Sequence, residues 1–291
     1  MVKDSVIDSV RLITNLDRIE CTRKAYMKNP RKPNILFVFR HEFEDLWRDG
    51  LWGAIKLLSF DYDITMCNLF KEKIEGATEY DFILGWGAFN GPVDVVIKDI
   101  PVPRGLCIAG VSPRPAWYKN YDVLFYETDW FLPNIAEHPN TVKAFGINTD
   151  IYKPMQLPKL WDFITVGAFA LWKRQHLLAK KEGLKLAVGE IQRGNVSESL
   201  NIIAKLLAHS VAISDMVPPE TLAILYNMSK CAYTPCDVFG GGERAILEAK
   251  ACRIEVEVEA DNPKLQELAD GPVYSHEDYY GRLKEGIKSC L

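Results

Sequence analysis

Short apolar runs recur along the chain and alternate with segments of helical periodicity. The first run, residues 34–39, is continuously apolar and is followed by Arg40, His41 and Glu42. A run of this length is typical of a parallel strand that is buried on both faces. We therefore predict strands at residues 34–39, 62–69, 80–84, 105–109 and 121–126, and again at 163–166, 184–188, 211–213, 231–235 and 254–259.

Helical periodicity occupies many of the intervals between these strands. It predicts helices at residues 2–27, 51–59, 175–181, 197–207 and 219–228, and one more after residue 242. Strands that alternate with helices predict doubly wound α/β domains. Pro154 and Pro158 bound a segment that we interpret as a linker between residues 1–152 and residues 153–291. Two such domains would face a cleft with the carboxyl ends of their strands.

The composition fits this organisation. The chain has 291 residues, of which 48% are hydrophobic, and its net charge is −4. This length is sufficient for two hydrophobic cores, and the balance of apolar and charged residues is typical of a globular protein. The acidic balance provides no global basic field and argues against nucleic acid as the main partner, although a local basic groove stays open.

The cysteines and the hydropathy bear on the compartment. The seven cysteines are scattered and form no CxxC pair, which favours reduced thiols and predicts no zinc or other metal site. The first residues include Asp4 and Asp8 and lack the apolar core of a signal peptide. No apolar run approaches the roughly 20 residues that span a bilayer. We therefore expect a cytoplasmic protein without a transmembrane segment.

Three successive glycines, Gly240, Gly241 and Gly242, separate a predicted strand from the helix that follows. Glycine adopts left-handed backbone angles and lets a ligand approach the amides. The amino end of the next helix favours an anion, and Glu243, Arg244 and Glu248 lie in its first turns. The pattern predicts a site for a phosphate and for hydroxyl groups. An ordinary strand–turn–helix with a solvated charged turn is the alternative.

Several residues of the first half follow predicted strands. Parallel sheets bind ligands at the carboxyl ends of their strands, so His41, Ser112 and Arg114 are candidates by position. A structural role for His41 is the alternative. Tryptophans are also frequent on these loops, where they would either stack on sugars or pack in an interface: Trp47, Trp52, Trp86 and Trp117.

The second half resembles the nucleotide-sugar domain of GT-B glycosyltransferases, in particular the large retaining family four. The resemblance depends on collinear segments: KAFGINTDIYKP at 143–154, TVGAFALWKR at 165–174, AISDMVPPETLAILY at 212–226, FGGGERAILEAKAC at 239–252 and NPKLQELADG at 262–271. It covers residues 140–285 in sequence and residues 34–130 only in architecture. It implies the GT-B fold, with two Rossmann-like domains facing a central cleft.

The resemblance assigns roles to individual residues. Lys173 matches the lysine that binds the diphosphate, after the loop that begins with Gly167. Glu248 matches the carboxylate that binds the ribose. Met216 and Val217 match the loop whose backbone frames the base. Alternatives remain, because Lys173 also fits a solvated turn and Glu248 an exposed glutamate that pairs with a neighbouring cation.

The sequence also departs from the family pattern. The first glutamate of the family's pair falls at Gly240, so Glu243 is the candidate that replaces it. The family's arginine after the first-strand glycine is Ala168 here, which leaves Arg174 or Arg244 to carry that charge. We expect Glu243 to face the hydroxyls of the sugar or to be neutralised by Arg174, because Arg244 points to another side of the helix. Lys173, Glu243 and His41 are thus the catalytic candidates.

The resemblance implies transfer of a sugar from a nucleotide-diphosphate sugar, UDP- or GDP-linked, to an unidentified acceptor hydroxyl. The acceptor classes are a carbohydrate, a lipid-linked glycan and a modified nucleic acid. The family's route retains the anomeric configuration and needs neither a metal nor another cofactor, because the leaving phosphate takes the acceptor proton. Inversion would need a base, for which His41 and Glu42 are the candidates.

Other functions fit the same pattern. The missing first glutamate is compatible with a non-catalytic nucleotide-sugar-binding protein. A phosphorylase or a nucleotide-sugar epimerase would use the same fold. The short first domain also suggests a phage-type transferase that glycosylates DNA bases, although the acidic net charge of −4 argues against it.

Overall fold

The computed structural model describes residues 31–42, 50–109 and 118–291, and Asn34–Leu291 form one compact unit. The helix predicted at residues 2–27 lies outside the described residues, as do Trp47, Ser112, Arg114 and Trp117. None of the helices in the described ranges combines the length and the hydrophobicity that a membrane crossing requires.

The first sheet has six parallel strands in the order β2-β1-β3-β4-β5-β6. They are β1 (Asn34–Phe39), β2 (Asp63–Asn68), β3 (Phe82–Gly87), β4 (Arg104–Ile108), β5 (Val123–Tyr126) and β6 (Thr141–Lys143). The strands predicted in this half are confirmed. The short edge strand β6 was not predicted, because its three residues carry no apolar run.

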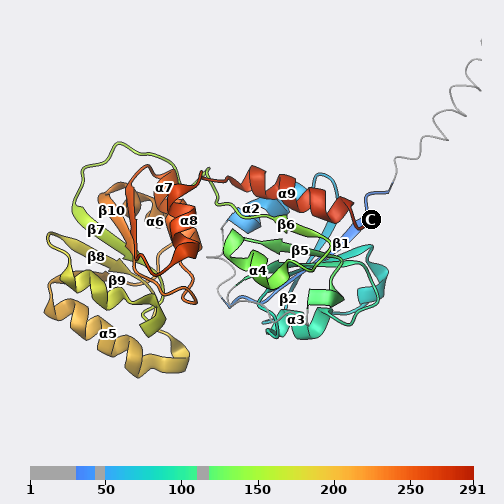
Figure 1. The fold of residues 1–291 in the computed structure, drawn as a ribbon, viewed down its shortest axis with the longest axis horizontal. Helices are drawn as coiled ribbons and strands as arrows, with labels where there is room; N and C mark the ends of the chain where they lie inside the picture. Colours follow the sequence, from blue (N-terminus) through green and yellow to red (C-terminus); the bar gives the residue numbers. More distant parts are fainter. Residues whose placement is uncertain (1–30, 43–49, 110–117) are drawn as a thin grey trace, which may run out of the picture. The chain divides into compact units, whose positions relative to one another are not determined.

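Both faces of this sheet are covered, as continuously apolar strands require. Phe37 and Phe39 of β1 pack into a core on one face, and Leu36 and Val38 pack into a second core on the other face. This alternation is the period of two that a strand imposes. Helices α2 (Gly50–Leu58) and α9 (His276–Lys288) cover the first face, and α3 (Pro92–Ile97) and α4 (Leu132–Ile135) lie on the opposite one (Figure 1).

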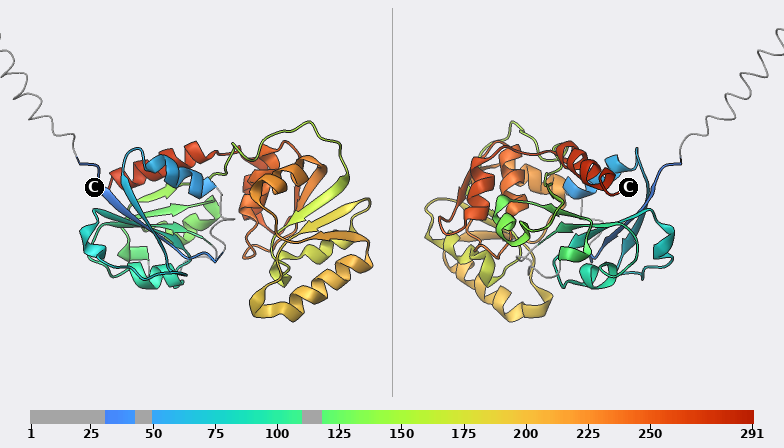
Figure 2. Two further views of the ribbon diagram at one scale, coloured as in Figure 1. Left: turned by 180° about the vertical axis from the view of Figure 1, so that it is seen from behind. Right: turned by 45° about the vertical axis from the view of Figure 1, so that its right-hand side comes forward.

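Helix α9 brings the end of the chain back to the first sheet. It lies beside α2 in both views of Figure 2 and also contacts β5 and β6. Ser275 and Asp278 form a capping box at its amino end. No helix was predicted here, because its apolar positions are interrupted by charged and aromatic residues.

The second sheet has five parallel strands in the order β11-β10-β7-β8-β9. They are β7 (Trp161–Val166), β8 (Lys185–Val188), β9 (Val211–Ser214), β10 (Ser229–Thr234) and β11 (Glu255–Val258). Helices α5 (Val196–Ala208), α6 (Pro219–Asn227), α7 (Glu243–Ala251) and α8 (Pro263–Asp270) surround it (Figure 1). Leu186 and Ala187 of β8 point into different cores, so this sheet is also covered on both faces.

Short 3₁₀ segments complete the fold. They are η2 (Ala77–Glu79), η3 (Tyr118–Asn120), η4 (Asp129–Phe131), η5 (Leu171–Lys173), η6 (Gln175–Lys180) and η7 (Arg193–Asn195). The predicted α-helix at 175–181 is η6 instead. Arg174 joins η5 to η6 with a φ of 48°, so no continuous α-helix can pass through this residue.

The change of sheet occurs between Lys143 and Trp161, and residues 154–158 belong to no helix or strand, as the predicted linker requires. The domain boundary at residue 152 stays a prediction. In each sheet the order in which successive strands are added reverses once. The reversal lies between β1 and β3 in the first sheet and between β7 and β10 in the second, and we call these two positions the switch points. Loops that leave such a pair of strands diverge and open a crevice at the carboxyl ends of the strands.

Candidate active site

A cavity of about 440 Å³ lies at both of these switch points. The first sheet contributes His41 after β1, Trp86 near the end of β3 and Glu127 after β5 to its wall. The second sheet contributes most of the remaining polar groups: Gly167, Lys173, Glu190, Gly241, Gly242, Glu243, Arg244 and Glu248. Predicted catalytic candidates from both halves of the chain therefore share one cavity.

The loop after β7 carries Lys173. Gly167 begins this loop with a φ of 139°, and its carbonyl accepts a hydrogen bond of 2.8 Å from Gln175 Nε2. A Cβ at Gly167 would lie 3.5 Å from Cδ and Cε of Lys173. Glycine therefore allows the positive φ at this position and leaves room for the aliphatic part of the Lys173 side chain beside it.

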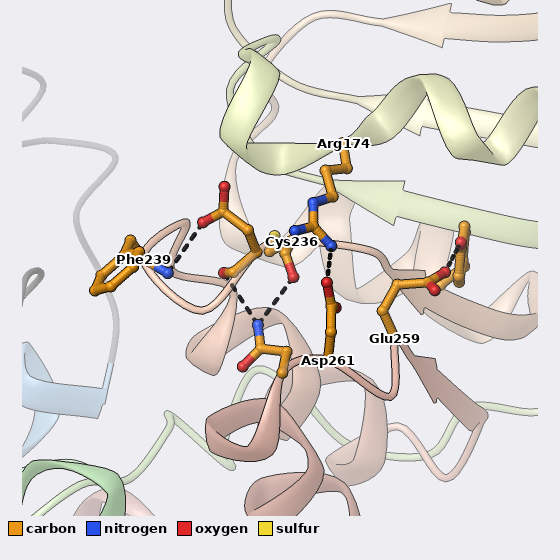
Figure 3. A network of polar contacts seen from close by, with 8 residues as sticks. Arg174, Cys236, Phe239, Glu259 and Asp261 are labelled. Carbon is orange, nitrogen blue, oxygen red and sulfur yellow. Dashed lines mark hydrogen bonds and ion pairs between the residues drawn. The ribbon is translucent and has the colours of Figure 1, made fainter.

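The glycine loop after β10 is held by hydrogen bonds from two sides. The Asp237 amide donates to the Trp172 carbonyl over 3.0 Å, which links the loop to η5. The buried Asn262 donates through Nδ2 to the carbonyl of Cys236, which is labelled in Figure 3 (2.9 Å), and to that of Asp237 (3.0 Å). The backbone of the loop is therefore fixed in place before any ligand binds.

Gly241 and Gly242 have φ values of 71° and 110°, so the predicted left-handed use of these glycines is confirmed. A Cβ at Gly241 would lie 3.2 Å from Lys173 Nζ and 3.4 Å from Glu243 Oε2. Gly240 differs, because it is buried and its Cβ would lie 2.4 Å from the Trp172 carbonyl oxygen. Gly240 therefore packs closely beneath η5, and its predicted contact with a donor stays a prediction.

Lys173 is half-buried and lines the cavity. It makes no ion pair with any residue that the structure describes. Its ammonium therefore remains available to an anion at the glycine loop.

Glu243 is buried, with an exposed fraction of 8%, and it forms an ion pair with Lys264, whose exposed fraction is 1%. The expectation that Arg174 neutralises Glu243 is wrong. Arg174 does not line the cavity and pairs with Asp261 over 2.7 Å (Figure 3). Its predicted contact with a donor stays a prediction.

Sequence reasoning missed Lys264, although a signal was present. It lies in the first turn of α8, at the positive end of the helix dipole. A lysine is unfavourable there unless a carboxylate neutralises it. This position therefore pointed to a nearby carboxylate, although not to its identity or its burial.

Glu248 is 6% exposed and accepts a hydrogen bond of 3.3 Å from the Tyr226 hydroxyl. Burial, and then the charge of Glu248, raise the pKa of Tyr226 well above its ordinary value. The phenol therefore stays protonated near neutral pH and orients the carboxylate by donating to it. The structure brings Glu248, Glu243 and Lys173 to one cavity, as predicted; their roles toward a donor stay predictions.

Met216 and Val217 line the cavity after β9. The Met216 amide donates to the Asp215 carboxylate over 2.8 Å. That amide is therefore already engaged. Pro219, Leu222 and Tyr152 add an apolar surface to this part of the cavity wall.

The first sheet contributes fewer charges. The His41 backbone is fixed by Asn68, which accepts from the amide over 3.1 Å and donates to the carbonyl over 2.8 Å. Glu42, the alternative base, forms an ion pair with Arg193 and does not line the cavity. Glu127 after β5 was missed, because nothing in the sequence distinguishes it from other charged loop residues.

No group of three histidine, cysteine or carboxylate side chains able to hold a metal ion occurs in residues 31–42, 50–109 and 118–291. The described cysteines are free thiols. Burial raises the pKa of Cys236, which lies next to the glycine loop, so its thiol is protonated near neutral pH.

No protein-family model and no curated protein sequence matches the chain. Solved structures do match it. Sucrose-phosphate synthase from Thermosynechococcus elongatus has a TM-score of 0.61 and 14% identity over 88% of this chain and 89% of that chain. HepE from Anabaena, in complex with UDP-glucose, has a TM-score of 0.60 and 13% identity over 89% of each chain.

Trehalose 6-phosphate synthase from Burkholderia multivorans matches with a TM-score of 0.57 and 10% identity, over 90% of this chain and 89% of that chain. At such identities these likenesses show the fold. The chain has the GT-B fold, in which two parallel α/β sheets contribute to one site.

Proposed function

We propose that this protein is a glycosyltransferase that moves a sugar from a nucleotide-diphosphate sugar to an acceptor hydroxyl. The observation that carries the proposal is the charge arrangement at the glycine loop. Glu243 is neutralised by Lys264, whereas Lys173 has no ion-pair partner among the described residues and lies beside the left-handed Gly241. One uncompensated positive charge, next to backbone amides, suits a diphosphate.

This arrangement suits a leaving group that becomes more negative. As the glycosidic bond breaks, negative charge develops on the departing diphosphate. A fixed ammonium therefore stabilises the transition state more strongly than the ground state. Lys173 and the amino end of α7 would provide this stabilisation. Glu248, oriented by Tyr226, would accept hydrogen bonds from the ribose, and Glu243 would accept them from the sugar.

The solved HepE complexes contain UDP, glucose or UDP-glucose, which supports a nucleotide-sugar donor here. We extend the proposal to a UDP- or GDP-sugar, to retention of configuration, and to transfer without metal or cofactor. In this route the leaving phosphate takes the acceptor proton. The acceptor would be a hydroxyl of a carbohydrate, a lipid-linked glycan or a modified nucleic acid.

The experiment is a release assay with UDP-, GDP- and ADP-sugars, each with carbohydrate, lipid-linked and DNA acceptors. We expect nucleotide release with one donor base, insensitivity to EDTA, and a product whose anomeric configuration by NMR equals that of the donor. Release that stops on chelation would contradict the metal-free route. An inverted product would contradict retention.

A non-catalytic nucleotide-sugar-binding protein is the second candidate. The observation that favours it is Gly240, which occupies the register position of the family's first glutamate and does not line the cavity. Calorimetry on the same donors separates the two functions. Donor binding without release under any acceptor condition would favour the binding protein over the enzyme.

A further inference from the structure

We infer that Lys264 is a positioning residue that keeps the Glu243 carboxylate from pairing with Lys173, and thereby keeps Lys173 available to the diphosphate. The inference rests on the proposed function and adds a residue that acts on the site through another residue. Lys264 itself does not line the cavity.

The first step is the competition that the geometry sets up. Lys173 Nζ and Glu243 Oε2 lie within 3.2 Å and 3.4 Å of the same point, where a Gly241 Cβ would stand. An ammonium and a carboxylate that both lie near one glycine attract each other where burial reduces screening by water. Glu243 nevertheless pairs with Lys264. Glu243 therefore has two possible lysine partners, Lys173 and Lys264. The lysine that it does not pair with remains available to an anion.

The second step is what holds Lys264 in place. Asn262 caps α8 by accepting from the Leu265 amide over 3.1 Å, and it also donates to the carbonyls of Cys236 and Asp237. One buried side chain thus fixes the first turn of α8 to the glycine loop. Lys264, in that first turn, is held at a constant position relative to Glu243.

The third step is the burial of the pair. Lys264 Nζ lies 5.5 Å from the centroid of the Trp130 ring, and Trp130 also packs edge-on against Phe239 of the glycine loop, with their centroids 6.0 Å apart. The aromatic ring covers an ammonium whose residue is 1% exposed. A buried lysine at the positive end of a helix strongly requires its carboxylate, so the Glu243–Lys264 pair persists when a diphosphate binds.

The test measures UDP or GDP affinity by calorimetry, using the nucleotide that the release assay selects. In Lys264→Met, the freed Glu243 carboxylate should pair with Lys173, and nucleotide affinity should fall by about tenfold or more, the worth of one contact to a charged group. Lys264→Arg retains the charge and should keep most of the affinity. Lys264→Gln provides a milder neutral variant if Lys264→Met does not fold.

The double variant Lys264→Met/Glu243→Gln is the decisive measurement. It removes the Glu243 carboxylate that the loss of Lys264 would otherwise free for Lys173, so nucleotide affinity should return to within a few-fold of the wild type. Lys250→Met is the matched control. Lys250 also ties α7 to α8, by donating to the carbonyls of Leu268 (2.7 Å) and Ala269 (2.6 Å), but it does not line the cavity. It should lower the melting temperature without changing nucleotide affinity.

The outcomes separate this inference from the proposed function. If the wild type binds no nucleotide, the proposed function fails. If the wild type binds nucleotide and both neutral Lys264 variants, folded at the assay temperature, bind it equally well, the inference is overturned and the pair is structural. An affinity loss in Lys264→Met that persists in the double variant would also overturn it, since Lys264 would then not act through Glu243.

Discussion

The two sheets present the same kind of switch point, yet they equip it differently. In the first sheet the switch point lies between β1 and β3 and presents His41 and Trp86. In the second it lies between β7 and β10 and presents Lys173, Gly241 and Gly242. Strand order opens a crevice in both sheets, but the loop residues decide which crevice presents the ammonium of Lys173.

Backbone conformation accounts for much of the difference. Gly241 and Gly242 have positive φ values, which allow the loop to turn tightly beside Lys173. The glycines of β3, Gly85 and Gly87, do not have positive φ and instead accommodate Val93 and Ile97 of α3. Glycine at the second switch point thus allows positive φ angles, whereas glycine at the first makes room for helix packing.

Removing the charge at the second switch point tests this contrast most strongly. Lys173→Ala should lower kcat/KM by about 2–4 kcal/mol of transition-state stabilisation, with turnover affected as well as donor binding. Steady-state kinetics on the donor identified by the release assay would measure it. Lys180 is an exposed lysine on η6, and Lys180→Ala is the control, which should leave kcat/KM unchanged. If turnover of Lys173→Ala stays within a few-fold of the wild type, Lys173 does not contact the phosphates.

The two carboxylates of α7 sharpen the comparison within the second switch point. Glu248→Gln should weaken binding of the free nucleotide diphosphate by about tenfold, because a charged acceptor of the ribose hydroxyls is lost. Glu243→Gln should leave that binding nearly intact and depress transfer from the whole nucleotide-sugar. Calorimetry with nucleotide alone and with intact donor measures both. Equal losses with nucleotide alone would mean that the two roles are assigned wrongly.

The smallest effect is expected at the first switch point. With retention of configuration, His41→Ala should leave nucleotide binding unchanged and reduce transfer by less than about tenfold, well below the 10²–10⁴ that a general base contributes. His209→Ala, at the exposed end of α5, is the control. A loss in the range of a general base would instead assign His41 that role and predict inversion. The two switch points would then share the chemistry.

The strands were predictable because their cause is local. Each continuous apolar run of the parallel sheets occupies a few adjacent residues, as Phe37, Val38 and Phe39 do with no exposed surface. The glycine loop was predictable for the same reason, since three adjacent glycines indicate unusual backbone angles. Helix α9 was not, because it is stabilised by packing on α2, far away in the sequence.

The sequence by itself therefore determined the α/β class, the glycine loop and the gathering of Lys173, Glu243 and Glu248 at the strand ends. The tertiary structure alone decided which charges pair. Arg174 and Asp261 lie 87 positions apart, and they meet because β7 and β11 belong to one sheet. The sequence places Lys264 near the amino end of a helix but does not tell how deeply it is buried. The packing of α8 against the glycine loop and the Trp130 ring bury it beside Glu243. Coulomb partners are selected by distance and burial, and both are properties of the folded chain.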